Sequence, residues 1–414
     1  MEHEKKIMIG IVFAWVMLVF IASASTEIPV KQWGKTYGGP TNDWAASVIQ
    51  TSDGGYMIAG SSESRSGTFC YDIWIVKTDS SGNKEWDKKF GGADNEHAYS
   101  VIQTSDGGYA IAGTTESKMD WSVFPSPTMF GEDEDIWLIK TGSSGNKEWD
   151  KMYGGAKRDT VSSIIQTSDG GYAFAGNMLI KTDSSGNEEW NITYGGSAYS
   201  VVQTFDGGYV LAGSFDGNFW LMKTDSFGNE EWNRTYGDIG SECAWEMIQT
   251  SDGGYALAGL KDPISFGNGS RDFWVVKTDS FGNEEWNRTY GSQYRDEARA
   301  MVQTSDGGYI LAGETGSDAW LVKVDSQGNK EWDEIYGGPD DDKANSVIQT
   351  SDGGYVFAGM TGSKDYRGGD FWLVKVGGST EEQPSGKEKI IPGFEIIFVI
   401  AGLLVVTYLL RRRK

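Results

Sequence analysis

One position in a repeated sequence motif changes its chemical character from copy to copy. The motif reads QTSDGGY, or QTFDGGY once, and the variable residue lies four positions before its glutamine. In chain order the seven copies carry at this position Ala46, Tyr99, Ser162, Tyr199, Trp245, Arg299 and Asn345. Exposed aromatic rings suit sugar faces, and Arg and Asn side chains donate hydrogen bonds. We therefore predict that five of these residues bind a ligand, namely Tyr99, Tyr199, Trp245, Arg299 and Asn345. The alternative is that they fill the entrance of a channel.

Catalytic chemistry finds less support. The only histidine outside the first few residues is His97, in a stretch expected to be a loop, so neither a histidine cluster nor a nucleophile–His–acid grouping is evident. Paired carboxylates could still hydrolyse glycosides. Acidic residues gather in three predicted loops, at 132–135, at 340–342, and at Asp296 with Glu297. These oxygens would suit calcium, but no D-x-D-x-D-G loop occurs. We predict no cofactor and a solvated acidic surface, with a calcium site as the alternative.

The repeat predicts the elements that hold these residues. Its first full copy reads SVIQTSDGGYMIAG, a variable stretch, and then DIWIVKTDSSGNKEWDKKFGG. Asp-Gly and Ser-Gly-Asn mark tight turns, and the segments around them are β-rich, so each copy contains four short strands, A to D. Four antiparallel strands at a period of this size are typical of a β-propeller blade.

Counting strands predicts a closed ring of seven blades. A strand-D tryptophan at Trp33 precedes every strand A, whereas the last copy ends at FWLVKVGG without a strand D. The N-terminal strand would complete the seventh blade, which removes the exposed edges of an open array. We therefore predict an all-β fold, a seven-bladed β-propeller over residues 30–377. The tryptophans that recur in strands C and D should pack one blade against the next.

The spacing also separates two ends of the ring. The A–B and C–D turns keep their lengths, whereas the B–C connections vary. The span from the strand-B glycine to the strand-C lysine is five positions from Gly176 to Lys181 but 27 positions from Gly113 to Lys140. Antiparallel order places the constant turns at one end and the variable B–C and D–A connections at the other. Binding sites usually form where variable loops meet a rigid scaffold.

Both ends of the chain indicate export. Lys5 and Lys6 precede an apolar run and Ala22-Ser23-Ala24, which is typical of a signal peptide at 1–24, an uncleaved anchor being the alternative. A linker at 378–390 leads to a second apolar run within 391–410, a predicted transmembrane helix, and then to a basic tail at 411–414 that favours the cytoplasmic side.

This tail resembles the archaeal PGF-CTERM sorting signal. The resemblance rests on Pro392-Gly393-Phe394, the apolar run and the terminal arginines. It implies an archaeal surface protein whose helix is removed by an archaeosortase and replaced by a lipid anchor. Either form of anchor makes the membrane a partner and leaves the propeller extracellular.

Charge and sequons limit the partners further. The formal net charge of −23 argues against nucleic acid, and the two cysteines, Cys70 and Cys243, provide no disulfide framework. Four N-glycosylation sequons occur, at Asn191, Asn233, Asn268 and Asn287. We expect a monomeric ectodomain that acts as a non-enzymatic binding or cell-envelope module, with a glycan or a protein as its ligand. A carbohydrate-active hydrolase or lyase and a purely architectural component are the alternatives.

Overall fold

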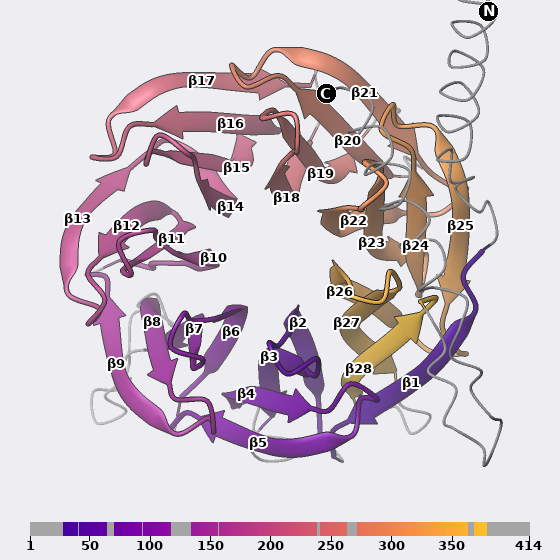
Figure 1. Cartoon of the computed structure of the whole chain (residues 1–414), viewed down its shortest axis with the longest axis horizontal. Coiled ribbons are helices and arrows are strands. Elements are labelled where there is room, and N and C mark those ends of the chain that lie inside the picture. Colours follow the sequence, from indigo (N-terminus) through magenta and orange to yellow (C-terminus); the bar gives the residue numbers. More distant parts are fainter. Residues whose placement is uncertain are drawn as a thin grey trace, which may run out of the picture. The chain divides into compact units, whose positions relative to one another are not determined.

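Seven four-stranded antiparallel sheets are arranged around a central axis and form a closed ring (Figure 1). The computed structural model describes residues 28–39, 41–63, 70–92, 94–116, 134–155, 157–237, 241–262, 271–362 and 368–378. The chain divides into Met1–Gly378, which contains the ring, and Ser379–Lys414, which lies outside the described residues. The predicted seven-bladed β-propeller is confirmed.

Each blade runs from its innermost strand A to its outermost strand D. The A strands are β2 (Asp43–Gln50), β6 (Glu96–Gln103), β10 (Val161–Gln166), β14 (Ser197–Gln203), β18 (Cys243–Gln249), β22 (Asp296–Gln303) and β26 (Asp342–Gln349). The B strands are β3 (Tyr56–Glu63), β7 (Tyr109–Glu116), β11 (Tyr172–Gly176), β15 (Tyr209–Phe215), β19 (Tyr255–Lys261), β23 (Tyr309–Thr315) and β27 (Tyr355–Gly362). The C strands are β4 (Tyr71–Thr78), β8 (Glu134–Thr141), β12 (Met178–Thr182), β16 (Asn218–Thr224), β20 (Asp272–Thr278), β24 (Asp318–Val324) and β28 (Gly369–Val376). The D strands are β5 (Lys84–Phe90), β9 (Lys147–Tyr153), β13 (Glu188–Thr193), β17 (Glu230–Tyr236), β21 (Glu284–Tyr290), β25 (Lys330–Tyr336) and β1 (Lys31–Tyr37).

The N-terminal strand closes the ring. β1 pairs antiparallel with β28, with Trp33 opposite Lys375 and Tyr37 opposite Phe371, so the last blade takes its outer strand from the start of the chain. Blades 1 to 6 therefore begin at β2, β6, β10, β14, β18 and β22, and blade 7 consists of β26, β27, β28 and β1. The closure predicted from the unpaired Trp33 strand is confirmed.

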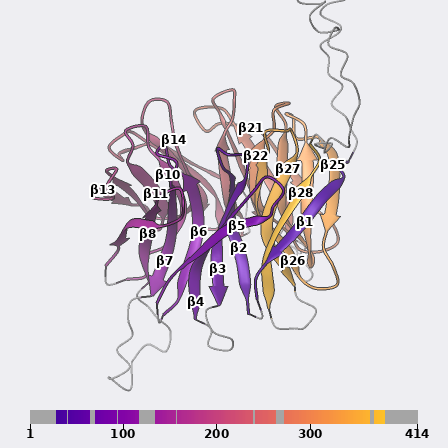
Figure 2. The ribbon, with the colours of Figure 1, turned by 60° about the horizontal axis from the view of Figure 1, so that its bottom comes forward.

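Two families of turns define one end of the ring. In the A–B turn of blade 1, Asp53 Oδ1 accepts hydrogen bonds from Thr51 Oγ1 and from the Gly55 amide, and Gly54 has a φ of 85°. In the C–D turn, Asp79 Oδ1 accepts from the amides of Ser81 and Asn83. We call the end that carries these turns the turn face, and the opposite end, with the B–C and D–A connections, the loop face (Figure 2).

Repeated side chains join neighbouring blades. At all seven junctions the strand-D tryptophan packs on the strand-B tyrosine of the next blade, with ring centroids 5.7–6.3 Å apart. On the turn face, the motif glutamine accepts a hydrogen bond from the A–B turn of the preceding blade, as Gln103 Oε1 does from the Ser52 amide at 2.9 Å. The prediction that the strand-D tryptophans pack blade against blade is confirmed.

Candidate functional site

The seven variable residues occupy the same special position, the extra residue of a β-bulge in each innermost strand. In blade 5, Ala244 is opposite Gly259 and Glu246 is opposite Ala258, so Trp245 has no partner on β19. The same register shift occurs in the A strands of the other six blades. A bulge bends a strand and changes the direction of its side chains. The fold thus holds one bulge residue per blade at the same position of the innermost strand, and its type changes from blade to blade.

A glycine on strand B makes room for each bulge. A Cβ at Gly259 would lie 1.8 Å from the backbone oxygen of Cys243, and one at Gly313 would lie 1.9 Å from that of Glu297. Such contacts recur in every blade, at 1.8–2.2 Å, for Gly60, Gly113, Gly176, Gly213, Gly259, Gly313 and Gly359. The repeated Ala-Gly that ends strand B is therefore the sequence signal for the bulge.

Three of the five predicted residues form one continuous group across blades 4, 5 and 6. The rings of Tyr199 and Trp245 pack at a centroid distance of 4.5 Å and an angle of 55°. The Arg299 guanidinium lies over the Trp245 ring at 5.5 Å, within the range of a cation–π interaction. We call Tyr199, Trp245 and Arg299 the aromatic–arginine arc.

Two donors in this arc have no partner among the described residues. Trp245 Nε1 and Arg299 Nε are both buried and make no hydrogen bond. Buried donors of this kind are normally satisfied, and leaving one unsatisfied costs about 1–3 kcal/mol. The arc therefore combines aromatic surface with two unused N–H groups.

Carboxylates hold the arginine in place. Arg299 Nη2 donates to Glu297 Oε2 at 2.8 Å and to Glu314 Oε1 at 3.1 Å. Glu297, only 2% exposed, also pairs with Arg271 and Arg295, and these cations keep its pKa below the ordinary value despite its burial. Two of its partners, Arg295 and Arg299, flank Glu297 in the chain, whereas Arg271 comes from the segment that leads into β20.

The other two predicted residues lie apart from the arc. Tyr99, 37% exposed, is next to His97, with ring centroids 6.5 Å apart. His97 in turn packs against Trp44 and Tyr71, at 5.5 Å from each. Asn345 Nδ2 donates to the backbone oxygen of Ala45 in the next blade. The five predicted residues therefore do not form a single cluster.

His97 and several acidic residues are placed differently from the prediction. His97 lies within β6, not in a loop, and burial lowers its pKa. Asp296, Glu297 and Asp342 were expected on a solvated surface, but they are in strands and at most 2% exposed. The carboxylates of Asp296 and Asp342 accept backbone N–H groups from the preceding loops, of Ser292 and Gly338, which explains their burial. Glu132 and Asp133 lie outside the described residues.

A ring of serine hydroxyls follows the bulges around the inner strands. The Oγ atoms of Ser346, Ser47, Ser100 and Ser163 accept hydrogen bonds from amides of the next blade, at 3.1–3.4 Å. Blade 5 has Glu246 at the equivalent position and blade 6 has Ala300. Glu246 Oε1 accepts from Ser200 Oγ at 2.9 Å and from the Met247 amide, and burial raises the pKa of Glu246 to about 7.

This glutamate should make stability depend on pH. Its folded-state pKa lies above the ordinary 4.5, so its effect on stability is neutral at low pH and becomes destabilising as the pH rises from 4.5 through 7. We expect Glu246→Gln to stabilise the protein by about 3 kcal/mol at pH 8 and not at pH 4. Thermal unfolding of both proteins across this range measures the difference. If the stability of Glu246→Gln changed with pH in parallel with that of the parent protein, the raised pKa of Glu246 would be contradicted.

Metal binding has no geometric support in the described residues. They contain no group of three or more His, Cys, Asp or Glu side chains arranged to hold a metal ion. The calcium alternative therefore stays without a located site.

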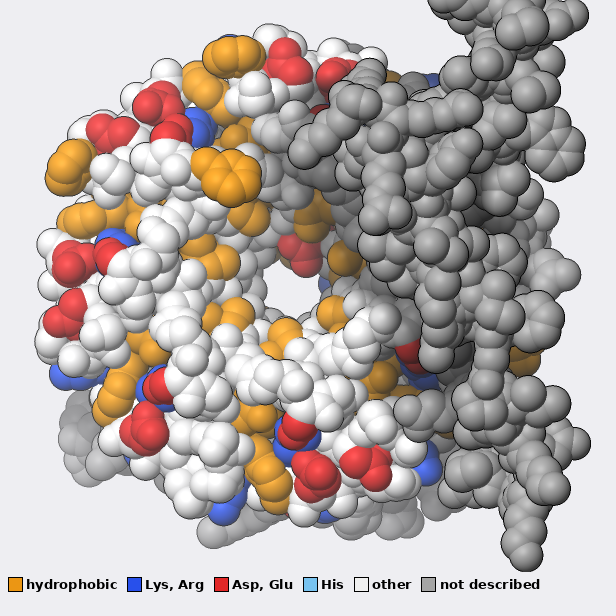
Figure 3. Space-filling model, in the orientation of Figure 1, with side chains coloured by type: hydrophobic (Ala, Val, Ile, Leu, Met, Phe, Trp, Pro, Cys, Tyr) orange, Lys and Arg blue, Asp and Glu red, His pale blue; other side chains and the backbone are white. Residues whose placement is uncertain are grey.

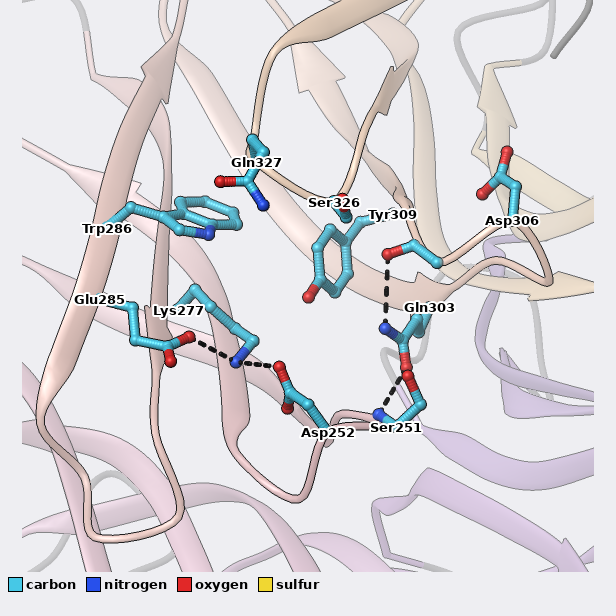
Figure 4. A pocket seen from close by; sticks show the side chains of 11 residues that line it. Ser251, Asp252, Lys277, Glu285, Trp286, Gln303, Asp306, Tyr309, Ser326 and Gln327 are labelled. Carbon is cyan, nitrogen blue, oxygen red and sulfur yellow. Dashed lines mark hydrogen bonds and ion pairs between the residues drawn. The ribbon is translucent and has the colours of Figure 1, made fainter. Parts of the chain in front are cut away.

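A groove of 610 Å³ on the turn face consists of scaffold residues (Figure 4). It lies between blades 5 and 6, where Lys277 pairs with Asp252 at 2.9 Å and with Glu285 at 2.8 Å, and Trp286 packs on Tyr309. Equivalent lysine–carboxylate pairs and Trp–Tyr contacts recur at other blades, for example at Lys77. The groove is therefore a product of the repeat and not a distinct site.

Three predicted glycosylation sites are accessible. Asn191, Asn233 and Asn287 lie exposed on the outermost strands, and each Nδ2 donates to the glutamate three residues earlier. Asn268 lies outside the described residues, as do the predicted signal peptide, the linker from residue 379 onwards, the apolar helix and the basic tail. The described part of the chain has no helix long and apolar enough to cross a bilayer.

Comparison with known proteins identifies the tail and the fold. Residues 391–413 match the PGF-CTERM motif. No curated protein is similar to the chain in sequence. Among solved structures, the chain is similar to BBS1N in its complex with ARL6DN, at a TM-score of 0.54 and 10% identity over 86% of this chain and 98% of that one. It is also similar to a protein of unknown function from Dyadobacter fermentans, at a TM-score of 0.52 and 9% identity over 84% of this chain and 99% of that one. The Pan2 WD40 domain of Neurospora crassa is similar at a TM-score of 0.51 and 9% identity, over 85% of this chain and 99% of that one. At these identities the likeness concerns the fold alone.

The sorting motif establishes where the protein acts. PGF-CTERM marks membrane-anchored cell-surface proteins that an archaeosortase processes, and the domain ahead of the motif is extracellular. The chain is thus a surface-anchored protein with an extracellular β-propeller.

Proposed function

We propose that this propeller is a non-enzymatic binding protein of the cell surface and that its aromatic–arginine arc binds a glycan. The observation that carries the proposal is the packed, half-buried pair of rings of Tyr199 and Trp245 beside the Arg299 guanidinium. A sugar offers both an apolar face for the rings and oxygen acceptors for a guanidinium.

The rigidity of the arc supports the same proposal. Glu297 and Glu314 fix the Arg299 guanidinium, and the inner strands fix the two rings. A site that is already ordered loses little side-chain entropy when it binds a ligand. The bulge position also allows the side chain to change from blade to blade without loss of the scaffold.

A glycan array tests the proposal. The secreted chain should bind a defined set of glycans, and Trp245→Ala should weaken that binding about tenfold or more, because the aromatic surface for the sugar face is lost. Trp245→Phe keeps a smaller aromatic ring and should give an intermediate loss of affinity.

Trp44→Ala is the matched control, since Trp44 is a half-buried tryptophan beside the bulge of another blade. It should leave binding unchanged. Equal losses in Trp44→Ala and Trp245→Ala, with both variants folded, would place the ligand elsewhere. Absence of binding to any glycan would leave a protein ligand or the architectural role.

One observation favours the hydrolase alternative. Glu246 has a pKa of about 7, which suits a general acid at neutral pH, and it is adjacent to Trp245 in the chain. A glycosidase also needs a second carboxylate, and the acids next to the arc, Glu297 and Glu314, are already paired with cations. Release of reducing sugar from a bound glycan, abolished in Glu246→Gln, would establish this alternative.

A further inference from the structure

Three exposed phenylalanines interrupt the polar turn face. Phe205 is in the A–B turn of blade 4, Phe227 in the C–D turn of blade 4, and Phe281 in the C–D turn of blade 5. Their exposed fractions are 101%, 74% and 66%. Figure 3 shows hydrophobic side chains raised separately on this face, over the part of the ring where Figure 1 places β14–β17.

Other blades use small polar residues at these positions. The A–B position is serine in six blades, for example Ser251, and the C–D position is serine in blades 1 to 3, for example Ser185. The turn does not require phenylalanine, because Asp183 Oδ1 accepts from the Ser185 amide at 2.8 Å just as Asp225 Oδ1 accepts from the Phe227 amide. The three phenylalanines are therefore exposed apolar side chains that the turns do not require, and all three lie on one face of two neighbouring blades.

The chain leaves the ring on this same face. Gly378 follows β28, its backbone oxygen accepts from Gln32 Nε2, and the Gly377 amide donates to Val30. A Cβ on Gly354, in the A–B turn of blade 7, would lie 2.5 Å from Gly377 O. The exit point therefore adjoins the turns of blade 7.

The tether from this point to the membrane signal is short. Residues 379–390 separate Gly378 from the PGF-CTERM motif, and about 12 residues span at most roughly 40 Å. With the turn face toward the membrane this tether runs directly to the bilayer. With the loop face toward the membrane it would have to pass around the outside of the ring.

We propose that the turn face lies on the lipid bilayer, with Phe205, Phe227 and Phe281 inserted at its surface. The tether leaves from blade 7, and the phenylalanines are on blades 4 and 5, across the ring from it (Figure 1). The tether and the inserted phenylalanines contact the bilayer at two separate places on the turn face, so this face lies parallel to the membrane. The loop face and its bulge residues then point away from the cell. The contact is apolar, because a chain with a net charge of −23 gains nothing from anionic headgroups.

Site-specific labelling of the full chain tests this orientation. In a Cys70→Ser, Cys243→Ser background, a polarity-sensitive dye is placed at Ser226→Cys, next to Phe227, or at Ser241→Cys on the loop face; both serines are exposed. The chain is anchored in phosphatidylcholine vesicles that contain nitroxide-labelled lipid. We expect at least several-fold stronger quenching at position 226 than at 241, and no loss of it at high salt.

The triple variant Phe205→Ser, Phe227→Ser, Phe281→Ser separates insertion from tethering. It restores residues that other blades already use, so it should fold, and it should abolish the quenching at position 226. Met152→Ser with Ile335→Ser, exposed apolar residues on outer strands, is the matched control and should leave the quenching unchanged.

Three results would overturn the proposal. Stronger quenching at 241 would reverse the orientation. Unchanged quenching in the triple variant would show that the phenylalanines do not insert. A concentration-dependent dimer of the detergent-solubilised chain, lost in the triple variant, would assign the patch to a second copy of the protein. None of these results bears on glycan binding at the arc.

Discussion

Replacing Gly259 with alanine is expected to destabilise the protein by about 3 kcal/mol and to displace Trp245. The new Cβ would lie 1.8 Å from Cys243 O and 2.9 Å from Ala244 Cα, so β18 must move away from β19 or lose its bulge. Both outcomes change the direction of the Trp245 side chain. Chemical denaturation measures the stability, and the affinity for an array-identified glycan measures the displacement.

The control for this substitution is Gly155→Ala. Gly155 lies on the loop face in the connection to blade 3, and a Cβ there would meet nothing within 4 Å. The free energy of unfolding of this variant should lie within about 0.5 kcal/mol of that of the parent, as is usual for surface substitutions. If Gly259→Ala were equally mild, the close approach of the two strands would not be what defines the bulge.

Removing the N-terminal strand should have a still larger effect. A secreted chain without residues 28–37 loses the whole β1–β28 ladder, the contact of Trp33 with Tyr56, and the hydrogen bond from Tyr37 Oη to Gly82 O. It also uncovers β28, where Phe371 and Leu373 are fully buried. We expect a loss of about 5 kcal/mol or more, a large part of the net stability of a typical domain.

Adding the missing strand as a separate peptide provides the decisive comparison. A synthetic peptide of residues 28–37 should raise the unfolding temperature of the shortened chain, and the same peptide with Trp33→Ala should raise it less. Removing residues 379–414 instead should leave the unfolding temperature unchanged, since no strand of the ring includes them. A shortened chain that unfolds at the parent temperature would show that the ring does not depend on this closure.

Local sequence signals were sufficient to predict the fold. Each blade repeats the same turn residues and the same strand-D tryptophan, and the unpaired Trp33 strand matched the blade that lacked one. Such patterns depend on residues near one another in the chain. The exact role of the motif glutamine was not evident, because Gln103 accepts its hydrogen bond from Ser52, in the preceding copy.

The site could be predicted only in part. Alignment of the repeats singled out the bulge positions, yet it did not show that Tyr199, Trp245 and Arg299 touch while Tyr99 and Asn345 lie apart. The acids at Asp296 and Asp342 resembled solvated loop residues, yet each accepts the amide four residues earlier, a contact that recurs at Asp43, Glu96 and Asp159. Glu246 and Ala300 are the two departures from a serine position, and the raised pKa of Glu246 follows from burial that no local pattern reveals.

The pairing of β1 with β28 has a consequence for the order in which the protein is made. β1 is synthesised first, yet its partner is nearly the last part of the ring to emerge; Gln32 and Gly378, which bond at this seam, are 346 residues apart. Until then β1 has an unpaired edge, and its lysines, Lys31 and Lys35, discourage pairing with other chains. Contacts this distant in sequence form slowly, so closure should be the final step of folding. A chain interrupted before β28 is complete would remain an open arc that exposes the β1 edge.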